Sequence, residues 1–262
     1  MVIIPIFCYN FTMTKENNRL YPQSTDFCTL DYECAYLDGK SVRMNYKYVR
    51  NSNMDFNSAV IERGWRRFGN YYFYPICNGC NECKSLRIDV ENFKPSKSQR
   101  KALNRNKNTT YIIQKPTVTI AHVNLYNKYH AWRSKKSNWK EHSDISKIEY
   151  YENFAEGAFD FGKEVLYYID NKLVGVDLID ITNDGISSIY FYYDPDYERN
   201  SLGIYSLVKQ VEFAKILNKK WIYLGYWVDG CRSFEYKAKF KPLEILDGFP
   251  DIKEAPAWKE FK

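Results

Sequence analysis

Two adjacent arginines are the side chains best suited to binding a carboxylate. Arg66 and Arg67 lie between Gly64 and Gly69. A guanidinium group presents a planar fork of donors that matches both oxygens of a carboxylate. The flanking glycines allow the backbone to present both forks to a cleft. The competing interpretation is a charged turn that faces solvent.

A cluster of cations follows farther along the chain. It consists of Lys94, Lys97, Arg100, Lys101, Arg105 and Lys107. The net charge of +6 and the pI of about 8.7 are compatible with a polyanionic partner, although many proteins without one have a similar charge. The cluster is therefore either a phosphate-binding surface or the start of a basic helix that faces water.

Asp194 is a candidate for handling an amine. It lies where a strand is expected to leave the core, so its carboxylate could hold an amine or remove its proton. The competing interpretation is an Asp-Pro turn, because Pro195 follows it. Tyr190 and Tyr226, which lie on expected strands, are the other catalytic candidates.

Four of the seven cysteines are candidate metal ligands. Cys77, Cys80 and Cys83 form a Cys-x-x-Cys-x-x-Cys run, and Cys34 is the fourth. Such thiolates suit zinc or an iron–sulfur cluster, but the run is tighter than the usual paired knuckles and the fourth ligand is distant. The metal hypothesis therefore stays open. The three histidines, at positions 122, 130 and 142, suggest neither a metal site nor a triad, and His130 is expected on a helix surface.

The cysteine content and the first residues favour a cytoplasmic protein with reduced thiols. A secreted disulfide scaffold would be smaller and richer in cysteine. The apolar stretch over residues 2–8 is too short to span a membrane, and it lacks the basic segment and the cleavage site of a signal peptide.

The elements that must position these residues fall into two portions. The chain has 262 residues, 45% of them hydrophobic, which is enough for one large domain or two intertwined ones. We expect a weakly structured N-terminus over residues 1–27, an N-terminal portion over 28–110 and a C-terminal portion over 111–262. The N-terminal portion is expected to contain a helix over 54–64 and a strand over 71–74.

The C-terminal portion has the clearer pattern. Two helices are expected within 120–157, the second with Ile145, Ile148 and Tyr151 on its apolar face. Strands are expected at 164–169, 173–181 and 186–193, then a helix over 201–217, a strand over 221–226 and a short helix over 230–239. This order predicts an α+β fold of the GNAT acyltransferase type, with a mixed, mostly antiparallel sheet flanked by helices.

An ordered set of short motifs resembles one enzyme family. The motifs are Gly-Trp-Arg-Arg-Phe-Gly at 64–69, the cysteine run from Pro75 to Cys83, Pro-Ser-Lys-Ser-Gln-Arg at 95–100, Tyr-Asp-Pro-Asp at 193–196, Ser-Leu-Gly-Ile-Tyr at 201–205, Tyr-Leu-Gly-Tyr-Trp at 223–227, and finally Cys231, Tyr236-Lys237, Phe240 and Pro242-Leu243-Glu244. Their order over residues 28–246 is similar to the arginyl-tRNA–protein transferase family, and in particular to its short bacterial branch, the aspartate/glutamate leucyltransferases. The chain departs from the usual family pattern at Tyr74 and at Ser233-Phe234, which affects local contacts.

The resemblance implies a GNAT-like fold and an aminoacyl transfer reaction. Leucine would come from leucyl-tRNA, and the acceptors would be proteins that begin with Asp or Glu, as in the N-degron (N-end rule) pathway of protein degradation. The partners would be this tRNA and these proteins, with no membrane. The short length and the single Cys34, where longer eukaryotic members carry a Cys-x-x-Cys pair, favour the leucyl branch over the arginyl one.

An aminoacyl-tRNA is an activated ester, so its transfer depends on positioning more than on covalent catalysis. The α-amine of the acceptor has a pKa of about 7.7–8.0, so roughly a tenth of it is neutral at pH 7. Positioning can contribute about 7–11 kcal/mol. We therefore expect no covalent nucleophile and no cofactor required for transfer. Arg66 and Arg67 would bind the acceptor carboxylate.

The residues expected to bind tRNA lie in two motifs and near the end of the matched region. They are Lys97, Gln99, Arg100, Arg105, Arg199, Ser201, Gly203 and Lys237. Residues 199–203 resemble the phosphate-gripping turn of GNAT enzymes, where free N–H groups at a helix N-terminus bind an anion. Here the anion would be the 3′ end of the tRNA.

Three alternatives remain at this point. The sister activity transfers arginine to the same acceptors. A GNAT-type N-acetyltransferase using acetyl-CoA should carry a fuller Gly-rich loop, whereas this chain has only Gly203 there. A non-catalytic RNA-binding or zinc-knuckle module would not need the ordered motifs between Tyr193 and Glu244.

Overall fold

The computed structural model describes residues 22–137 and 144–262 of the chain. Residues 1–21, which make up most of the segment expected to be weakly structured, and His142 lie outside the described residues. The expectation of weak structure is wrong for residues 24–27, because Ser24–Cys28 form strand β1.

A small antiparallel sheet carries the first part of the chain. In spatial order it consists of β1 (Ser24–Cys28), β4 (Met44–Val49), β6 (Tyr71–Pro75) and β5 (Arg66–Phe68), with a separate hairpin of β2 (Tyr32–Glu33) and β3 (Ser41–Val42). Helix α1 (Met54–Glu62) begins where the Asn53 side chain accepts a hydrogen bond from the N–H of Phe56, at 2.8 Å. It covers one face of the sheet and packs Phe56 and Val60 against Val49 and Tyr72.

An eight-stranded sheet forms the rest of the molecule. Its spatial order is β14 (Trp258–Glu260), β13 (Leu243–Leu246), β7 (Lys84–Asp89), β12 (Trp221–Trp227), β11 (Gly185–Tyr193), β10 (Lys172–Ile181), β9 (Gly162–Ile169) and β8 (Thr110–Gln114). All neighbouring pairs are antiparallel except β11 with β12, which run parallel.

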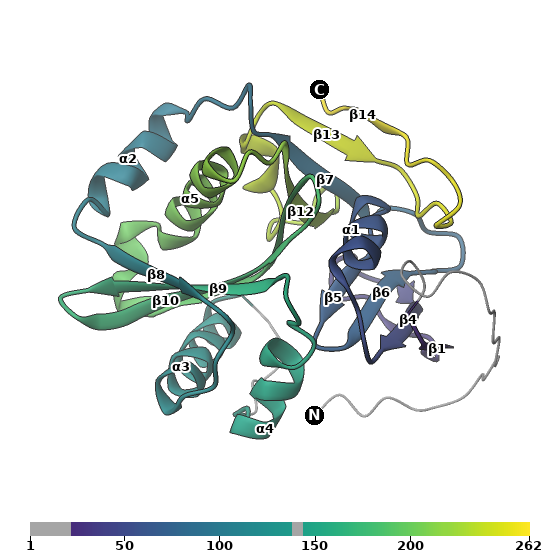
Figure 1. Cartoon of the computed structure of the whole chain (residues 1–262), viewed down its shortest axis with the longest axis horizontal. Helices are drawn as coiled ribbons and strands as arrows, with labels where there is room; N and C mark the ends of the chain where they lie inside the picture. The colour runs from purple at the N-terminus through teal and green to yellow at the C-terminus, as the bar shows by residue number, and fades with distance from the viewer. Residues whose placement is uncertain (1–21, 138–143) are drawn as a thin grey trace.

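Helices cover both faces of the large sheet (Figure 1). They are α2 (Lys97–Arg105) and α5 (Leu202–Ile216) on one side, and α3 (Ile120–Ser137) and α4 (Lys147–Tyr150) on the other. The main core lies under α5, where Val208 and Val211 pack with strand residues such as Ile186 and Ile222. A second core under α3 is built largely of aromatic rings. The two cores thus cover the apolar side chains on both faces of the sheet.

Strands β11 and β12 separate soon after they begin to pair. Their register runs from Gly185 opposite Trp221 to Ser187 opposite Tyr223, and no pairing follows it among the described residues. The pairing of β12 with β7 is irregular between Tyr223 and Gly225, where Gly225 has a φ of +69°. The result is a divergence in the middle of the sheet, which we call the β11–β12 divergence.

The predicted α+β class with a mostly antiparallel sheet flanked by helices is confirmed. The core order of three antiparallel strands, a helix and a parallel strand is the one expected for the GNAT type. The sheets divide the chain between β6 and β7, because β7 joins the large sheet although it precedes residue 111, and β8 spans the expected boundary.

Two expected helices differ from the structure. After α4 the chain continues as a π-helix, Tyr151–Ala155, and the side chains buried there are Tyr150 and Phe154. Ile148 and Tyr151, expected on the apolar face, are 70% and 50% exposed. The π turn that follows Tyr150 is wider than an α turn, and the residue buried within it is Phe154. The helix expected over 230–239 is reduced to turns and a 3-10 turn at Lys237–Lys239.

No helix among residues 22–137 and 144–262 is both long and apolar enough to cross a membrane.

Candidate active site

Arg66 reaches from the small sheet into the β11–β12 divergence. Its guanidinium donates hydrogen bonds to the carbonyl oxygens of Ser188 and Ile189, the latter at 3.5 Å, and to Ser187 Oγ at 3.4 Å. These groups belong to β11 at and just beyond its last pairing with β12. Gly225 supplies the space, since a Cβ there would lie 2.6 Å from the Arg66 Cζ atom.

Lys237 enters the same region from the side of β12. Its ammonium donates a hydrogen bond to the carbonyl oxygen of Tyr226, at 2.5 Å, and lies 4.5 Å from the centre of the Phe234 ring. The side chain is buried, with 7% of the residue exposed. The 3-10 turn at the end of the cysteine-containing loop places it there.

These two cations lack a counter-ion in the part of the chain that the structure describes. The hydrogen bonds of Arg66 and Lys237 go to carbonyl and hydroxyl oxygens, and neither forms an ion pair. Burial lowers the pKa of Arg66. Burial, and then repulsion by Arg66, lower the pKa of Lys237 to about 7. An anion bound near both cations would relieve both penalties.

Aromatic side chains surround the cations. The Tyr226 hydroxyl donates to the carbonyl oxygen of Phe73 at 3.1 Å, which ties the large sheet to the small one. Burial raises the pKa of Tyr226 well above its ordinary range. Tyr36 and Phe234 contact each other with ring centres 4.9 Å apart. A neutral, hydrogen-bonded Tyr226 therefore positions the two sheets, and its hydroxyl is not a ready proton acceptor.

Tyr190 lies in a separate aromatic cluster beside the divergence. Its hydroxyl is 2.7 Å from His130 Nε2, and its ring stacks on Phe154 at 5.8 Å. Burial raises the pKa of Tyr190 well above its ordinary range. His130 was expected on a helix surface, but it also stacks on Tyr126 at 4.1 Å and is partly buried. The i, i+4 spacing of Tyr126 and His130 was the signal that could have placed both on the buried face.

Comparisons with known proteins cover most of the chain. The N-terminal model of the arginine-tRNA-protein transferase family matches residues 32–101, and the C-terminal model matches residues 121–247. The chain is 47% identical to an aspartate/glutamate leucyltransferase of Campylobacter jejuni over 87% of this chain and 95% of the relative. It is 41% identical to a protein of the same name from Helicobacter hepaticus, over 87% and 94%.

The chain belongs to the arginine-tRNA-protein transferase family. A solved structure, L-PGS from Bacillus licheniformis, is also similar, with a TM-score of 0.40, 14% identity, and coverage of 68% of this chain and 58% of that one. The membership agrees with the resemblance seen in the sequence motifs.

Arg67, next to Arg66 in this family member, is used inside the fold. Its guanidinium forms a two-pronged pair with Asp180, at 2.7 and 2.6 Å, and donates to the carbonyl oxygens of Gly69 and Gly157 at 2.6 and 3.0 Å. The two residues are 4% and 0% exposed as side chains. The geometry therefore favours Arg66, and not Arg67, as the ligand of an incoming carboxylate.

Asp194 is likewise held by other residues. Its carboxylate accepts hydrogen bonds from Lys128 at 2.5 Å and Lys172 at 2.7 Å, and from the N–H of Asp196 at 3.1 Å. Burial opposes the charge, but these three bonds outweigh it and hold the pKa of Asp194 below its ordinary range. A carboxylate with a low pKa and both oxygens occupied is a poor base. Its position as the cap of the turn Pro195–Asn200 matches the competing interpretation of an Asp-Pro turn.

Several residues expected to bind tRNA border a hollow of about 180 Å³ between α2 and the start of α5. Arg105 donates to the carbonyl oxygen of Arg199 at 2.9 Å and to Ser201 Oγ at 3.4 Å. Ser201 adopts a left-handed conformation with φ of 56°, and its side chain makes no capping bond to α5. Lys101 and Lys239 also line the hollow, which gives it a positive rim.

The remaining predicted tRNA ligands differ in their surroundings, and among them only Gln99 also lines this hollow. Lys97 and Arg100 are exposed on α2, where phosphates can reach them. Gln99 is buried, completes the capping box of α2 with Ser96, and donates to the carbonyl oxygen of Lys239, so its contacts are structural. A Cβ at Gly203 would meet only ordinary contacts, so the position does not require glycine. Lys237 belongs to the divergence described above.

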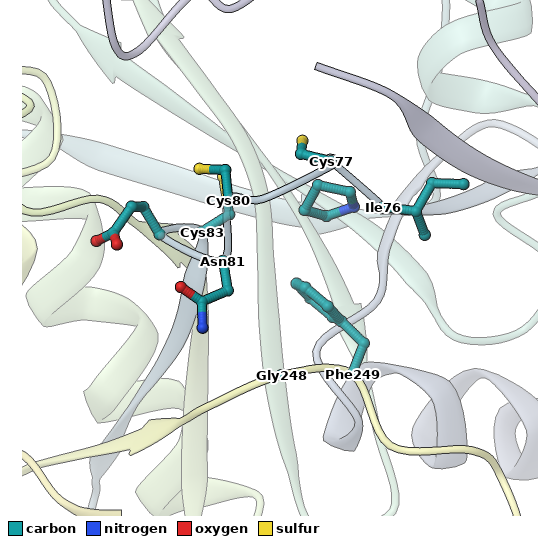
Figure 2. Close-up of a pocket in the computed structure, with 9 residues that line it drawn as sticks. Ile76, Cys77, Cys80, Asn81, Cys83, Gly248 and Phe249 are labelled. Carbon is teal, nitrogen blue, oxygen red and sulfur yellow. The ribbon is translucent and has the colours of Figure 1, made fainter. Parts of the chain in front are cut away.

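Three of the four cysteines of the predicted metal site, Cys77, Cys80 and Cys83, line a hollow of about 130 Å³. Burial raises the pKa of Cys83 to about 12, and Cys77, Cys34 and Cys80 add to that rise. Figure 2 shows Cys77 set apart from Cys80 and Cys83, with Phe249 on the opposite wall. Within the described ranges no group of three or more Cys, His, Asp or Glu side chains is arranged to hold a metal ion. The thiols as placed do not fit a metal, and the metal hypothesis stays a prediction from spacing alone.

Proposed function

We propose that the protein transfers leucine from leucyl-tRNA to the α-amino group of proteins that begin with Asp or Glu. The observation that carries this proposal is the pair of cations, the partly buried Arg66 and the buried Lys237, at the β11–β12 divergence with no counter-ion among the described residues. The names of the relatives from Campylobacter jejuni and Helicobacter hepaticus support the same activity.

Arg66 reads the acidic side chain of the acceptor in this proposal. A carboxylate that enters the divergence gains the guanidinium fork, whereas an uncharged isostere leaves the cation uncompensated. The fixed hydrogen bonds to Ser188 and Ile189 hold the guanidinium before the acceptor arrives, so little ordering remains to be done on binding.

Lys237 is the group that best fits removal of the proton from the acceptor amine. With a pKa of about 7, near the value of the amine itself, roughly half of it is neutral at neutral pH. The amine lone pair then forms an amide bond to the carbonyl carbon of the aminoacyl ester. The ester C–O bond breaks, and the ribose oxygen of the tRNA leaves as a hydroxyl with the second proton of the amine. Lys237 keeps the first proton, which it took from the ammonium form of the acceptor.

The charges at the divergence favour a leucyl over an arginyl donor. A second guanidinium brought beside Arg66 and Lys237 would meet repulsion in a site where like charges are poorly screened. A leucyl side chain is neutral and fits the aromatic surroundings of Tyr226 and Phe234.

The 3′ end of the tRNA is held in this proposal at the hollow between α2 and α5. Arg105, Lys101 and Lys239 supply charge there, and the exposed Lys97 and Arg100 extend it along α2. Phosphate contacts of this kind position the substrate without reading its sequence. These proposed partners favour a reaction in the cytoplasm, where charged tRNA and new N-termini are both present.

The test is transfer measured by mass. The full chain is incubated with a peptide that begins with Asp, and in parallel with leucyl-tRNA, arginyl-tRNA and acetyl-CoA. The proposal predicts a leucine-sized increment on the N-terminus. An arginine-sized increment would assign the sister activity, and an acetyl increment would assign a GNAT-type acetyltransferase.

A further inference from the structure

A row of aromatic side chains crosses the small sheet and ends at Arg66. Phe27 on β1 is opposite Tyr46 on β4, Tyr46 is opposite Phe73 on β6, and Phe73 is opposite Arg66 on β5. Residues directly opposite one another in antiparallel strands point to the same face. The rings touch in sequence, with Phe27 stacked on Tyr46 at 5.3 Å and Tyr46 against Phe73 at 5.5 Å. We call these four residues the aromatic row.

The aromatic row lies on the face of the small sheet that α1 does not cover. Val49 and Tyr72, on the opposite face, form the core with α1. Phe27, Tyr46 and Phe73 are only partly buried, and the neighbouring Tyr71 is 40% exposed. Figure 1 shows β1 at the outer edge of the small sheet and β5 at the edge nearest the large sheet. The row therefore leads from the outer edge of the molecule into the β11–β12 divergence.

We propose that the aromatic row binds the acceptor polypeptide over the residues that follow its acidic N-terminus, and that it favours apolar side chains at those positions. This inference rests on the proposed function, because Arg66 is taken to hold the acidic side chain. Arg66 ends the row and fixes the first residue of the acceptor, so the chain that follows must leave the divergence. The row is the apolar path that is continuous with it.

The dimensions fit a short extended segment. Four neighbouring strands span three interstrand spacings, which is about 14 Å, and an extended chain advances about 3.3 Å per residue. About four acceptor residues would therefore cover the distance from Arg66 to Phe27. Rings that are already packed against one another lose little freedom when a ligand side chain covers them, which favours binding.

The charge distribution favours a polypeptide over tRNA on this row. Arg66 is the row's one charged member, and Lys47 on β4 belongs to the other face and pairs with Asp26 at 2.5 Å. The cations suited to phosphates lie instead around the hollow between α2 and α5. Nucleic-acid binding along the aromatic row would need such charges beside the rings.

The experiment measures equilibrium binding of two unreactive acceptors to the full chain. The short acceptor is an Asp-Ala amide, and the long one has Asp followed by four leucines. The inference predicts that the long acceptor binds at least about ten-fold more tightly than the short one, and that Tyr46→Ala and Phe27→Ala each reduce this ratio by about ten-fold. Tyr46→Phe, which keeps the ring, should restore it. Tyr111→Ala, which removes a 40% exposed tyrosine from β8, is the matched control and should leave the ratio unchanged.

Each other result overturns the inference. Equal affinity for the two acceptors, or a ratio that survives both alanine variants with an unchanged melting temperature, shows that the row does not carry the polypeptide. A loss of tRNA affinity in place of a change in the ratio assigns the row to tRNA. A loss of self-association measured by sedimentation assigns it to a second copy of the chain. Leucyl transfer is assayed in parallel, so its absence counts against the proposed function while the binding ratio still tests the row.

Discussion

Arg66 and Arg67 are adjacent on β5, yet they face two chemically different regions. Arg67 points into the core, where Asp180 neutralises it and carbonyl groups take its remaining donors. Arg66 points into the β11–β12 divergence, where it contacts carbonyl and hydroxyl groups but no carboxylate. Successive side chains of a strand alternate between its faces. One arginine therefore serves the fold, and the other keeps an unbalanced charge that a substrate can complete.

The largest expected effect is on stability, at Arg67. Arg67→Ala leaves Asp180 charged and buried without a partner, which should cost about 3–5 kcal/mol of unfolding free energy. Arg66→Ala frees only carbonyl and hydroxyl oxygens, with no buried charge among them, and should cost less, about 1–3 kcal/mol. Urea denaturation of both variants measures the difference. Equal losses of unfolding free energy in the two variants would show that the two faces of β5 do not differ in the way described.

The next effect is a pH dependence from Lys237. Its pKa is about 7 in the folded state, against an ordinary value of 10.5. Between these values the unfolded chain binds more protons, so unfolding free energy rises with pH, by at most about 1.4 kcal/mol per pH unit. Below pH 7 Lys237 is protonated in both the folded and the unfolded chain, so its contribution to the unfolding free energy is constant. Lys237→Met removes it, so the stability of the parent minus that of the variant should grow from pH 7 to 10. If the unfolding free energies of the parent and of Lys237→Met change with pH in parallel, the pKa of Lys237 is not lowered by folding.

A smaller effect is expected from Gly225→Ala. The backbone there has a φ of +69°, and the added Cβ would meet the Arg66 guanidinium at 2.6 Å. The cost should be about 1–3 kcal/mol of stability. Because Arg66 must shift, kcat/KM for an Asp acceptor should fall by more than the loss of folded protein can account for. Gly230→Ala is the matched control, since it has a similar φ of +72° but nothing within 4 Å of its Cβ. Equal kcat/KM in the two variants would show that Gly225 does not make room for Arg66.

The smallest effect concerns the tRNA surface. Replacing Lys97, Arg100 or Arg105 by Gln should weaken binding of all tRNAs alike and reduce the slope of log affinity against log salt by about one unit per lost phosphate contact. Nitrocellulose filter binding at several salt concentrations measures the slope. Lys259, exposed on the edge strand β14, is the control. An unchanged slope would show that these side chains of α2 do not contact phosphates and only face solvent.

Much of the fold could be predicted because its signals are local. The Asn183-Asp184-Gly185 turn, the alternation in β10 and β11 and the helix after Ser201 are all encoded within a few residues. The π-helix after Tyr150 was missed, since the added residue per turn comes from tertiary packing that a helical period does not record.

The candidate site was only partly predictable, because its chemistry depends on contacts between distant segments. The sequence motif made Arg66 and Arg67 equivalent, and only the contact with Asp180, far along the chain, separates them. On sequence grounds Asp194 could either handle an amine or belong to an Asp-Pro turn, and its ion pairs with Lys128 and Lys172 favour the turn. The sequence predicts Lys237 as a tRNA-binding residue. Its burial near Arg66 favours the role in proton removal proposed above.

The most direct test of the central claim is the preference of the enzyme for acidic acceptors after Arg66 is replaced. kcat/KM is measured for peptides that begin with Asp and with Asn, in the parent, in Arg66→Ala and in Arg66→Lys, beside the Kd for leucyl-tRNA. Arg66→Ala should lose about 2–5 kcal/mol of transition-state stabilisation for the Asp peptide, with little change for Asn or for the tRNA. Arg66→Lys should recover part of the preference, because the charge remains without the fork. If Arg66→Ala keeps the parental preference for Asp over Asn, the carboxylate is read by another group and the account of the divergence is contradicted.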